Sequence, residues 1–293
     1  MKNFKATMTA LITPFKEGAV DFASLESLVR HQVKNGVEGF VINGTTAESP
    51  TLTDAERKDI FTAVRSLVGA NFPLVMGTGS NSTARTEELS EKSEEWGADA
   101  ILVVVPYYNK PPQRGLVKHF TEVAKSVSIP VLLYNVPGRT ITSLALESIV
   151  ELSRVQNIVG IKEASGNIEF DREIIQNTSP EFVMLSGDDG TYVDFLKAGG
   201  HGVISVASHV IPKEMVSWKK LVQGGKYEEA KTQLQKYTPL INHLFVEANP
   251  IPVKMALYYM GIIKSPELRL PLVTMDEDLA QKMKRDMSAL GVI

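Results

Sequence analysis

Eight short apolar segments recur along this chain of 293 residues, and stretches with helical periodicity separate them. Each segment is mostly apolar throughout, without alternation, which is the pattern of parallel strands buried on both faces. Eight strand–helix units predict a (β/α)8 TIM barrel. An open, doubly wound sheet is the alternative, but the chain lacks a dinucleotide-binding loop. The predicted strands are residues 6–12, 39–43, 74–77, 100–105, 131–135, 158–162, 183–186 and 202–206.

The segments between these strands predict helices. Thr53 and Glu56 have the spacing of a capping box, in which each side chain bonds the backbone amide of the other residue. Gly36, Gly97 and Gly199 follow helical stretches and predict glycine C-caps. The seven predicted helices are residues 24–35, 55–68, 83–96, 116–126, 144–153, 167–177 and 191–198.

The remainder of the chain predicts helices only, at residues 212–223, 226–246, 250–260 and 276–289. We therefore predict a catalytic barrel at residues 1–224 and a C-terminal helical region at residues 225–293 that packs on it. No stretch rich in glycine, serine or proline separates the two parts.

Composition narrows the functional class. The 31 basic and 34 acidic residues give a formal charge of −3, and without a basic run we expect neither a nucleic-acid nor a membrane partner. The chain has no cysteine, which excludes disulfides and thiolate zinc sites, and its histidines lack metal-ligand spacing. We expect no metal and a cytoplasmic location. No apolar run approaches the roughly 20 residues of a membrane-spanning helix.

Lys162 ends an apolar strand, Ile158 to Ile161, where an ammonium group is out of place. Burial disfavours the charged form of a lysine and frees its amine to attack a carbonyl. A lysine that snorkels into solvent or pairs with Glu163 is the structural alternative.

Other strand ends carry polar groups, and in a barrel of this kind such ends form the active site. Amine, phenol, hydroxyl and guanidinium groups together suit a keto acid substrate. Each group also has a structural explanation: a helix cap, packed aromatic rings or a surface charge. The residues with these groups are Thr45 and Thr46, Tyr107 and Tyr108, Tyr134 and Arg139, and Lys162, and Gly187 and Ile204 lie at two further strand ends.

These motifs, together with Thr13-Pro14-Phe15, Asn249-Pro250-Ile251-Pro252-Val253-Lys254 and Arg269-Leu270-Pro271, resemble the dihydrodipicolinate synthase family. This family belongs to the class I pyruvate-dependent lyases and aldolases, and the resemblance covers essentially the whole chain. It implies a lyase that condenses pyruvate with L-aspartate 4-semialdehyde, in the diaminopimelate route to lysine, without a cofactor.

The resemblance also implies residue roles. Lys162 matches the lysine that forms a Schiff base with pyruvate, and Tyr134 matches the phenol that relays protons. The remaining matches are Thr45 and Tyr108 as relay partners, with Tyr108 from a neighbouring subunit, Thr46 on the pyruvate carboxylate, Ile204 with its backbone oxygen facing the site, and Arg139 on the aldehyde's carboxylate. We also assign Gly187, at the end of the seventh predicted strand, to substrate binding. A subunit-crossing tyrosine implies a homo-oligomer, in this family most often a tetramer of two dimers.

Two features depart from the family pattern. Ala47 stands where the family usually has glycine, and it would strain the loop if that position needs a positive φ. Ser49, Asn81 and Tyr107 resemble part of the cleft that binds lysine in inhibited members, but Arg85 replaces a glutamate there and Arg57 a histidine. We therefore predict insensitivity to lysine.

Two alternative functions remain. One is a sibling aldolase that cleaves N-acetylneuraminate or a keto-deoxy sugar acid, and Arg139 argues against it because such substrates need hydroxyl partners. The other is a non-catalytic relative that binds keto acids. A pure binder has no use for the relay of Tyr134, Thr45 and Tyr108.

Overall fold

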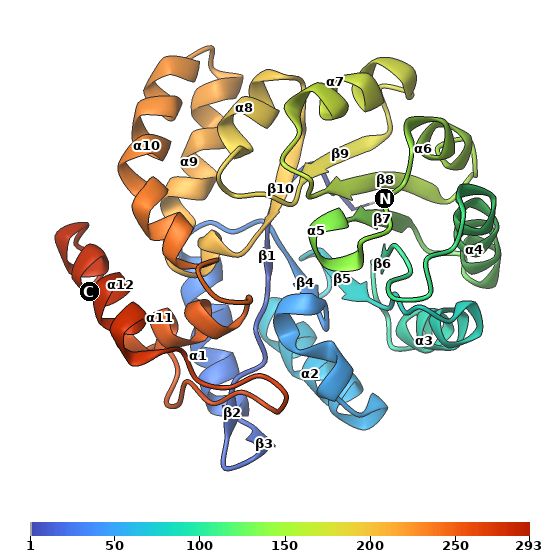
Figure 1. The fold of residues 1–293 in the computed structure, drawn as a ribbon. Helices are drawn as coiled ribbons and strands as arrows, with labels where there is room; N and C mark the ends of the chain where they lie inside the picture. The colour runs from blue at the N-terminus through green and yellow to red at the C-terminus, as the bar shows by residue number, and fades with distance from the viewer. Residues whose placement is uncertain (1) are drawn as a thin grey trace. The chain divides into compact units, whose positions relative to one another are not determined.

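The computed structural model describes residues 2–293 and confirms the predicted barrel (Figure 1). Its strands close in the order β1-β10-β9-β8-β7-β6-β5-β4, so the doubly wound alternative is wrong. Each predicted strand begins and ends within two residues of the observed strand. The barrel strands are β1 (Thr7–Ala10), β4 (Gly39–Ile42), β5 (Leu74–Gly77), β6 (Ala100–Val104), β7 (Val131–Asn135), β8 (Ile158–Glu163), β9 (Val183–Ser186) and β10 (Gly202–Ser205).

All predicted helices are present, including the four after the last strand. They are α1 (Phe22–Lys34), α2 (Asp54–Val68), α3 (Thr83–Glu95), α4 (Gln113–Ser126), α6 (Leu146–Leu152), α7 (Ile168–Asn177), α8 (Tyr192–Lys197), α9 (Pro212–Gln223), α10 (Tyr227–His243), α11 (Ile251–Tyr259) and α12 (Glu277–Ala289). Short 3-10 turns lie at Thr45–Ala47, Ser49–Thr51 and Ala207–His209.

The predicted capping signals are confirmed. The Thr53 side chain accepts from the backbone amide of Glu56, and the Glu56 carboxylate accepts from that of Thr53. Gly36, Gly97 and Gly199 all have positive φ, a conformation that costs glycine little because it has no Cβ.

Two small elements were not predicted. A hairpin pairs β2 (Phe15–Lys16) with β3 (Ala19–Val20), and the turn residues Glu17 and Gly18 both have positive φ, as in a type I′ turn. The single turn α5 (Pro137–Thr140) follows β7 and is too short to give a helical periodicity.

Close strand packing explains one glycine inside a strand. A Cβ at Gly160 of β8 would lie 2.3 Å from the carbonyl oxygen of Val183 on β9. Only a residue without a side chain fits, so β8 and β9 approach closely just before Lys162 on β8.

The chain divides into two compact units. The first unit is residues 2–6 and Pro73–Ile204, and the second unit is Thr7–Phe72 and Ser205–Ile293. Each unit combines two separate stretches of the chain, whereas the sequence predicted a single boundary after residue 224. That boundary stays a prediction. No helix among residues 2–293 is long and apolar enough to cross a membrane.

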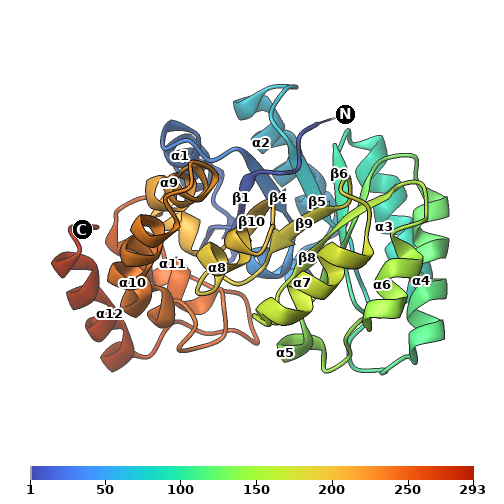
Figure 2. The ribbon, with the colours of Figure 1, turned by 90° about the horizontal axis from the view of Figure 1, so that it is seen from above.

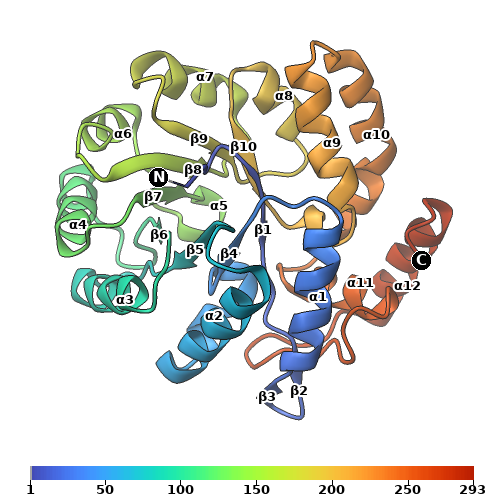
Figure 3. The ribbon, with the colours of Figure 1, turned by 180° about the vertical axis from the view of Figure 1, so that it is seen from behind.

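In the first unit, α3, α4, α6 and α7 follow one another outside β5–β9 (Figure 1). In the second unit, α12 packs against both α10 and α11 (Figure 2), and α1 lies beside α2 (Figure 3). The C-terminal helices therefore pack against one another and, through α9, against β1.

Candidate active site

Lys162 and Tyr134 face each other across two neighbouring strands of the first unit. They are partners in the register of β7 and β8, and Nζ of Lys162 lies 4.2 Å from the centre of the Tyr134 ring. Lys162 is 6% exposed and Tyr134 7% exposed. Among residues 2–293, no carboxylate lies within ion-pair distance of this amine, so the predicted alternative of a Glu163 pair is wrong. An amine held against a phenol suits carbonyl attack with proton transfer.

Gly187 leaves room for the lysine side chain. It follows β9, and a Cβ at this position would lie 2.8 Å from Cε of Lys162 and 3.1 Å from its Cγ. Ile204 lies on the next strand, β10, and is 1% exposed. Both residues therefore stand at the strand ends where the sequence placed them.

A buried polar layer lies behind Lys162, and sequence analysis did not identify it. Successive strand residues point to opposite faces, so Glu163 faces away from the Lys162 side. Its carboxylate accepts from Nδ2 of Asn135 at 2.7 Å and from the backbone amide of Ser165 at 2.6 Å. Burial raises the pKa of Glu163, and these hydrogen bonds act in the opposite direction. The layer ties the end of β8 to the end of β7.

Asp171 on α7 adds a second buried carboxyl to this layer. It is 3% exposed, and its Oδ1 has no hydrogen-bond partner. Burial first, and then the charges of Glu163 and Asp188, raise the pKa of Asp171 to about 7. An acid in the first turn of an amphipathic helix is typical of an exposed residue near the helix N-terminus, so nothing in the local sequence indicates that Asp171 is buried.

Arg139 lies on α5, directly after β7, and its side chain is exposed. The turn is held by the Thr140 hydroxyl, which donates to Val136 O at 3.0 Å or to Thr142 O at 2.6 Å. Arg139 thus stands on a short, anchored segment directly after the strand of Tyr134.

Tyr107 and Tyr108 lie in the loop after β6. Tyr107 is 37% exposed, whereas Tyr108 is 88% exposed and has a φ of 74°. Asn109 fixes the loop, since its Nδ2 donates to the backbone oxygen of Asn81 at 2.8 Å. Most of the Tyr108 side chain is therefore uncovered by residues 2–293 of its own chain.

Thr45 and Thr46 lie in the second unit, in the 3-10 turn that follows β4. Thr46 is buried, and its hydroxyl oxygen accepts from Nδ2 of Asn249 at 2.8 Å. Ala47 does not have a positive φ; Glu48, the next residue, has a φ of 56°. The left-handed conformation that alanine would resist is therefore absent at residue 47.

The residues of the predicted lysine cleft are distributed over both units. In the second unit, Arg57 is buried and donates to the backbone oxygens of Ser49 at 2.5 Å and Leu52 at 3.4 Å. In the first unit, Arg85 pairs with Glu88 at 2.8 Å on the surface of α3. Arg57 therefore helps to hold its own loop instead of extending into solvent.

Among residues 2–293, no group of three or more histidine and carboxylate side chains is arranged to hold a metal ion.

Comparison with known proteins identifies the family. A sequence profile of the dihydrodipicolinate synthetase family matches residues 3–290. The 4-hydroxy-tetrahydrodipicolinate synthase of Bdellovibrio bacteriovorus is 61% identical over 293 residues, with both chains fully covered. A dihydrodipicolinate synthase structure from Thermotoga maritima superposes with a TM-score of 0.97 at 40% identity, covering 99% of each chain. A structure of the Acinetobacter baumannii enzyme complexed with pyruvate has a TM-score of 0.96 at 37% identity, covering 99% of this chain and all of that one.

Asp171 predicts a pH dependence of stability. Its folded pKa of about 7 lies above the unfolded value of about 3.8, so the folded state binds the extra proton between these values. The stabilisation is complete below about pH 4 and is lost as the pH rises through 7, with a slope of up to about 1.4 kcal/mol per pH unit.

We therefore expect Asp171→Asn to gain stability relative to the wild type as the pH increases from 4 to 7, because the variant cannot titrate. Urea unfolding at several pH values measures this difference. Asp171→Leu is the matched variant: its absolute stability will differ, but its pH slope should equal that of Asp171→Asn. Parallel pH profiles for wild type and both variants would contradict the prediction.

Proposed function

Because the chain belongs to the dihydrodipicolinate synthetase family, we propose that it is a lyase that forms 4-hydroxy-tetrahydrodipicolinate from pyruvate and L-aspartate 4-semialdehyde. The observation that carries this proposal is the buried Lys162 amine over the Tyr134 ring. Full-length relatives with this activity in their names, and the pyruvate complex of a similar structure, support it.

The Lys162 amine attacks the carbonyl carbon of pyruvate, and loss of water gives a protonated imine. The imine accepts the electron pair when a methyl proton leaves, which gives an enamine. The enamine carbon attacks the aldehyde, and the second substrate's own amine then displaces Lys162 and closes the ring. The imine itself is the electron sink, so the reaction needs no metal or organic cofactor.

Tyr134 is the group that we propose moves protons in these steps. Its ring lies 4.2 Å from the reacting amine in a buried position, and a phenol is a suitable group for general acid–base catalysis. Thr45 and Tyr108 serve as its relay partners. Thr46 and the backbone oxygen of Ile204 face pyruvate. Gly187 leaves space for the Lys162 side chain. The roles of Thr45, Thr46 and Tyr108 rest on the family resemblance.

Arg139 supplies specificity for the second substrate. A planar guanidinium binds a carboxylate with two parallel hydrogen bonds, so an anionic aldehyde fits it. Its exposed position on α5, directly after β7, leaves it accessible to a ligand. A sugar-acid aldolase would need hydroxyl partners here, and the relatives' names favour the synthase activity over that alternative.

We propose a homotetramer of two dimers in the cytoplasm. The exposure of Tyr108, 88% in the single chain, supports a second copy of the chain as the place where this side chain packs. Its left-handed backbone conformation costs energy, and a side chain that residues 2–293 leave 88% exposed gains little packing in return.

The proposed chemistry predicts a covalent adduct. Incubation with pyruvate and borohydride should reduce the imine and attach one pyruvate-derived group per chain, on the peptide that contains Lys162. Mass spectrometry of the digested protein locates the group. Lys162→Arg should remove it, whereas Lys5→Arg, which changes a partly exposed lysine in the first unit, should not. An adduct on another lysine would refute the proposal.

Arg139→Ala should raise the KM for L-aspartate 4-semialdehyde roughly ten- to a hundred-fold and leave that for pyruvate nearly unchanged. Loss of a charge-assisted hydrogen bond costs about 1.5–3 kcal/mol. Steady-state kinetics with each substrate varied gives the two constants. Arg172→Ala, which removes an exposed arginine from α7, is the control. Equal increases for both substrates would mean that Arg139 supports the whole site.

We also propose that lysine does not inhibit this enzyme. Arg85 stands where inhibited relatives carry a glutamate, which turns an attraction for a lysine ammonium into a repulsion. Two unit charges 4 Å apart near a protein surface interact by about 4 kcal/mol before salt screening. Glu88 offsets part of this charge, but it is shared with Lys92 at 2.6 Å. Arg85, Glu88 and Lys92 together therefore keep one positive charge.

Activity should persist in millimolar L-lysine, and Arg85→Glu should introduce partial inhibition. Inhibition curves at constant substrate concentration measure both effects. Lys92→Glu is the matched control, since it makes the same charge change farther along α3. Half-inhibition of the wild-type enzyme below 1 mM L-lysine, or equal sensitivity of the two variants, would refute the prediction.

A further inference from the structure

Glu48 is the junction between two 3-10 turns of the second unit. Thr45–Ala47 precedes it and Ser49–Thr51 follows it, and both turns use Glu48 as a flanking residue. Its φ of 56° is uncommon for a residue with a side chain and needs support from the surroundings. The conformation of this one residue therefore sets the direction of the loop that carries Thr45 and Thr46.

A buried ion pair supplies that support. Nζ of Lys254, on α11, donates to the Glu48 carboxylate, and both side chains are fully buried. The other carboxylate oxygen of Glu48 accepts from the backbone amide of Arg269 at 2.9 Å. Burial lowers the pKa of Lys254 to about 8, with Glu48 acting in the opposite direction, so the amine remains mostly charged at pH 7. Both oxygens of Glu48 are thus held by the C-terminal part of the chain.

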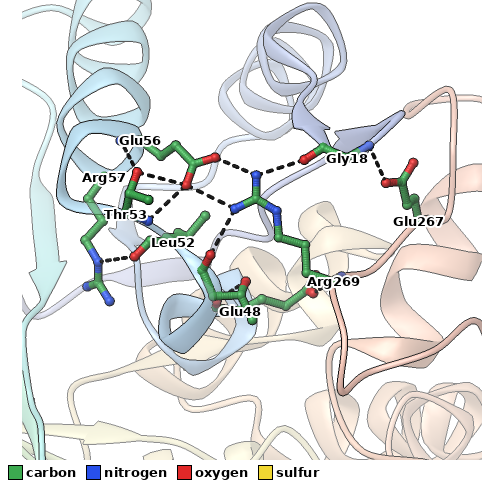
Figure 4. Close-up of polar contacts among 9 residues, drawn as sticks. Gly18, Glu48, Leu52, Thr53, Glu56, Arg57, Glu267 and Arg269 are labelled. Carbon is green, nitrogen blue, oxygen red and sulfur yellow. Dashed lines mark hydrogen bonds and ion pairs between the residues drawn. The ribbon is translucent and has the colours of Figure 1, made fainter.

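Arg269 holds the other side of the same loop (Figure 4). Its guanidinium donates to Glu56 at 2.5 and 3.0 Å, to the Thr51 backbone oxygen at 2.9 Å and to that of Gly18 at 2.9 Å. The Arg269 hydrogen bonds are the main cause that lowers the pKa of Glu56 to about 2. The second 3-10 turn and the start of α2 are therefore fixed to one side chain.

The Phe15 ring completes the cluster. Nζ of Lys254 lies 4.2 Å from the ring centre, and Cζ of Arg269 lies 4.4 Å from it. Both cations therefore contact the π system of one buried side chain, which favours positive charge. Two like charges are accommodated here because Glu48, Glu56 and the ring all face them.

The same C-terminal segment reaches Thr46 directly. Asn249 lies just before α11, and its Nδ2 donates to Oγ1 of Thr46. Because the hydroxyl oxygen accepts this bond, its proton is free to be donated to another acceptor. A substrate carboxylate is an acceptor of the required kind.

We propose that Lys254 and Arg269 are positioning residues, which hold Glu48 in its left-handed conformation so that Thr46 presents its hydroxyl to the pyruvate carboxylate. This inference rests on the proposed function for the identity of the ligand. It gives the C-terminal helical region a part in substrate binding, beyond packing. The contribution is indirect, because neither side chain needs to touch the substrate.

The test compares two double variants of the full chain. Glu48→Gln with Lys254→Met removes the ion pair without leaving one buried charge unpaired. The matched control is Glu38→Gln with Lys219→Met, which removes another ion pair of the second unit, at 3.0 Å, that contacts Thr7 and not the loop. Urea unfolding first establishes that both variants fold.

We expect the KM for pyruvate to rise about tenfold in the Glu48/Lys254 variant with a smaller change in kcat, because binding of the carboxylate is lost in ground and transition states alike. Hydrogen exchange of the amides in residues 44–52 should also accelerate, since four of them bond within the two turns. The control should change neither quantity by more than about twofold.

The outcomes separate the two proposals. An unchanged pyruvate KM, or unchanged exchange in residues 44–52, would overturn the positioning role while the wild-type protein still forms its borohydride-trapped adduct. Similar KM changes in both double variants would also overturn it, because general loss of stability would then be the cause. Failure of the wild-type protein to trap pyruvate would instead refute the proposed function, and exchange would still report on the loop.

Discussion

Burial of the barrel strands on both faces is the constraint on which the site depends. In such strands one side chain points to each face in turn, and almost every position must be apolar. Lys162 and Glu163 are adjacent exceptions at the end of β8, and they project in opposite directions. The lysine meets the ring of Tyr134, while the glutamate meets Asn135 on the same neighbouring strand. Of these two adjacent residues, Lys162 therefore serves the proposed reaction and Glu163 serves the structure.

The buried polar layer behind Lys162 holds the strand ends in place from the side opposite to the lysine amine. Glu163 binds the amide of Ser165 and the side chain of Asn135, and Gly187 donates its amide to Glu163 O at 2.6 Å. These contacts fix three successive strand ends relative to one another. Gly187 also has no side chain to obstruct Lys162, so close packing and access for the amine come from the same position.

The loop after β4 contains a backbone conformation that needs stabilisation from elsewhere in the chain. Its two turns are joined at a residue with a left-handed backbone, which the local sequence does not favour. Stability comes from charges brought in by the C-terminal region, where Lys254 and Arg269 lie on a shared aromatic ring. Ala47 is compatible with the backbone of this loop, because the positive φ falls on its neighbour, Glu48. The appended helices thus contribute to the loop that carries Thr45 and Thr46.

Local sequence patterns determined the eight strands, the eleven longer helices and the positions of Lys162 and Tyr134 at strand ends, because each depends on residues close together in the chain. The tertiary structure alone decided which polar side chains meet inside the protein. Glu48 and Lys254 are 206 positions apart, and no periodicity links them. Asp171 has the sequence context of a surface acid in the first turn of its helix, yet the fold buries it where the charges of Glu163 and Asp188 act on it. The cost of burying a charge is a property of its surroundings, and those exist only once the chain has folded.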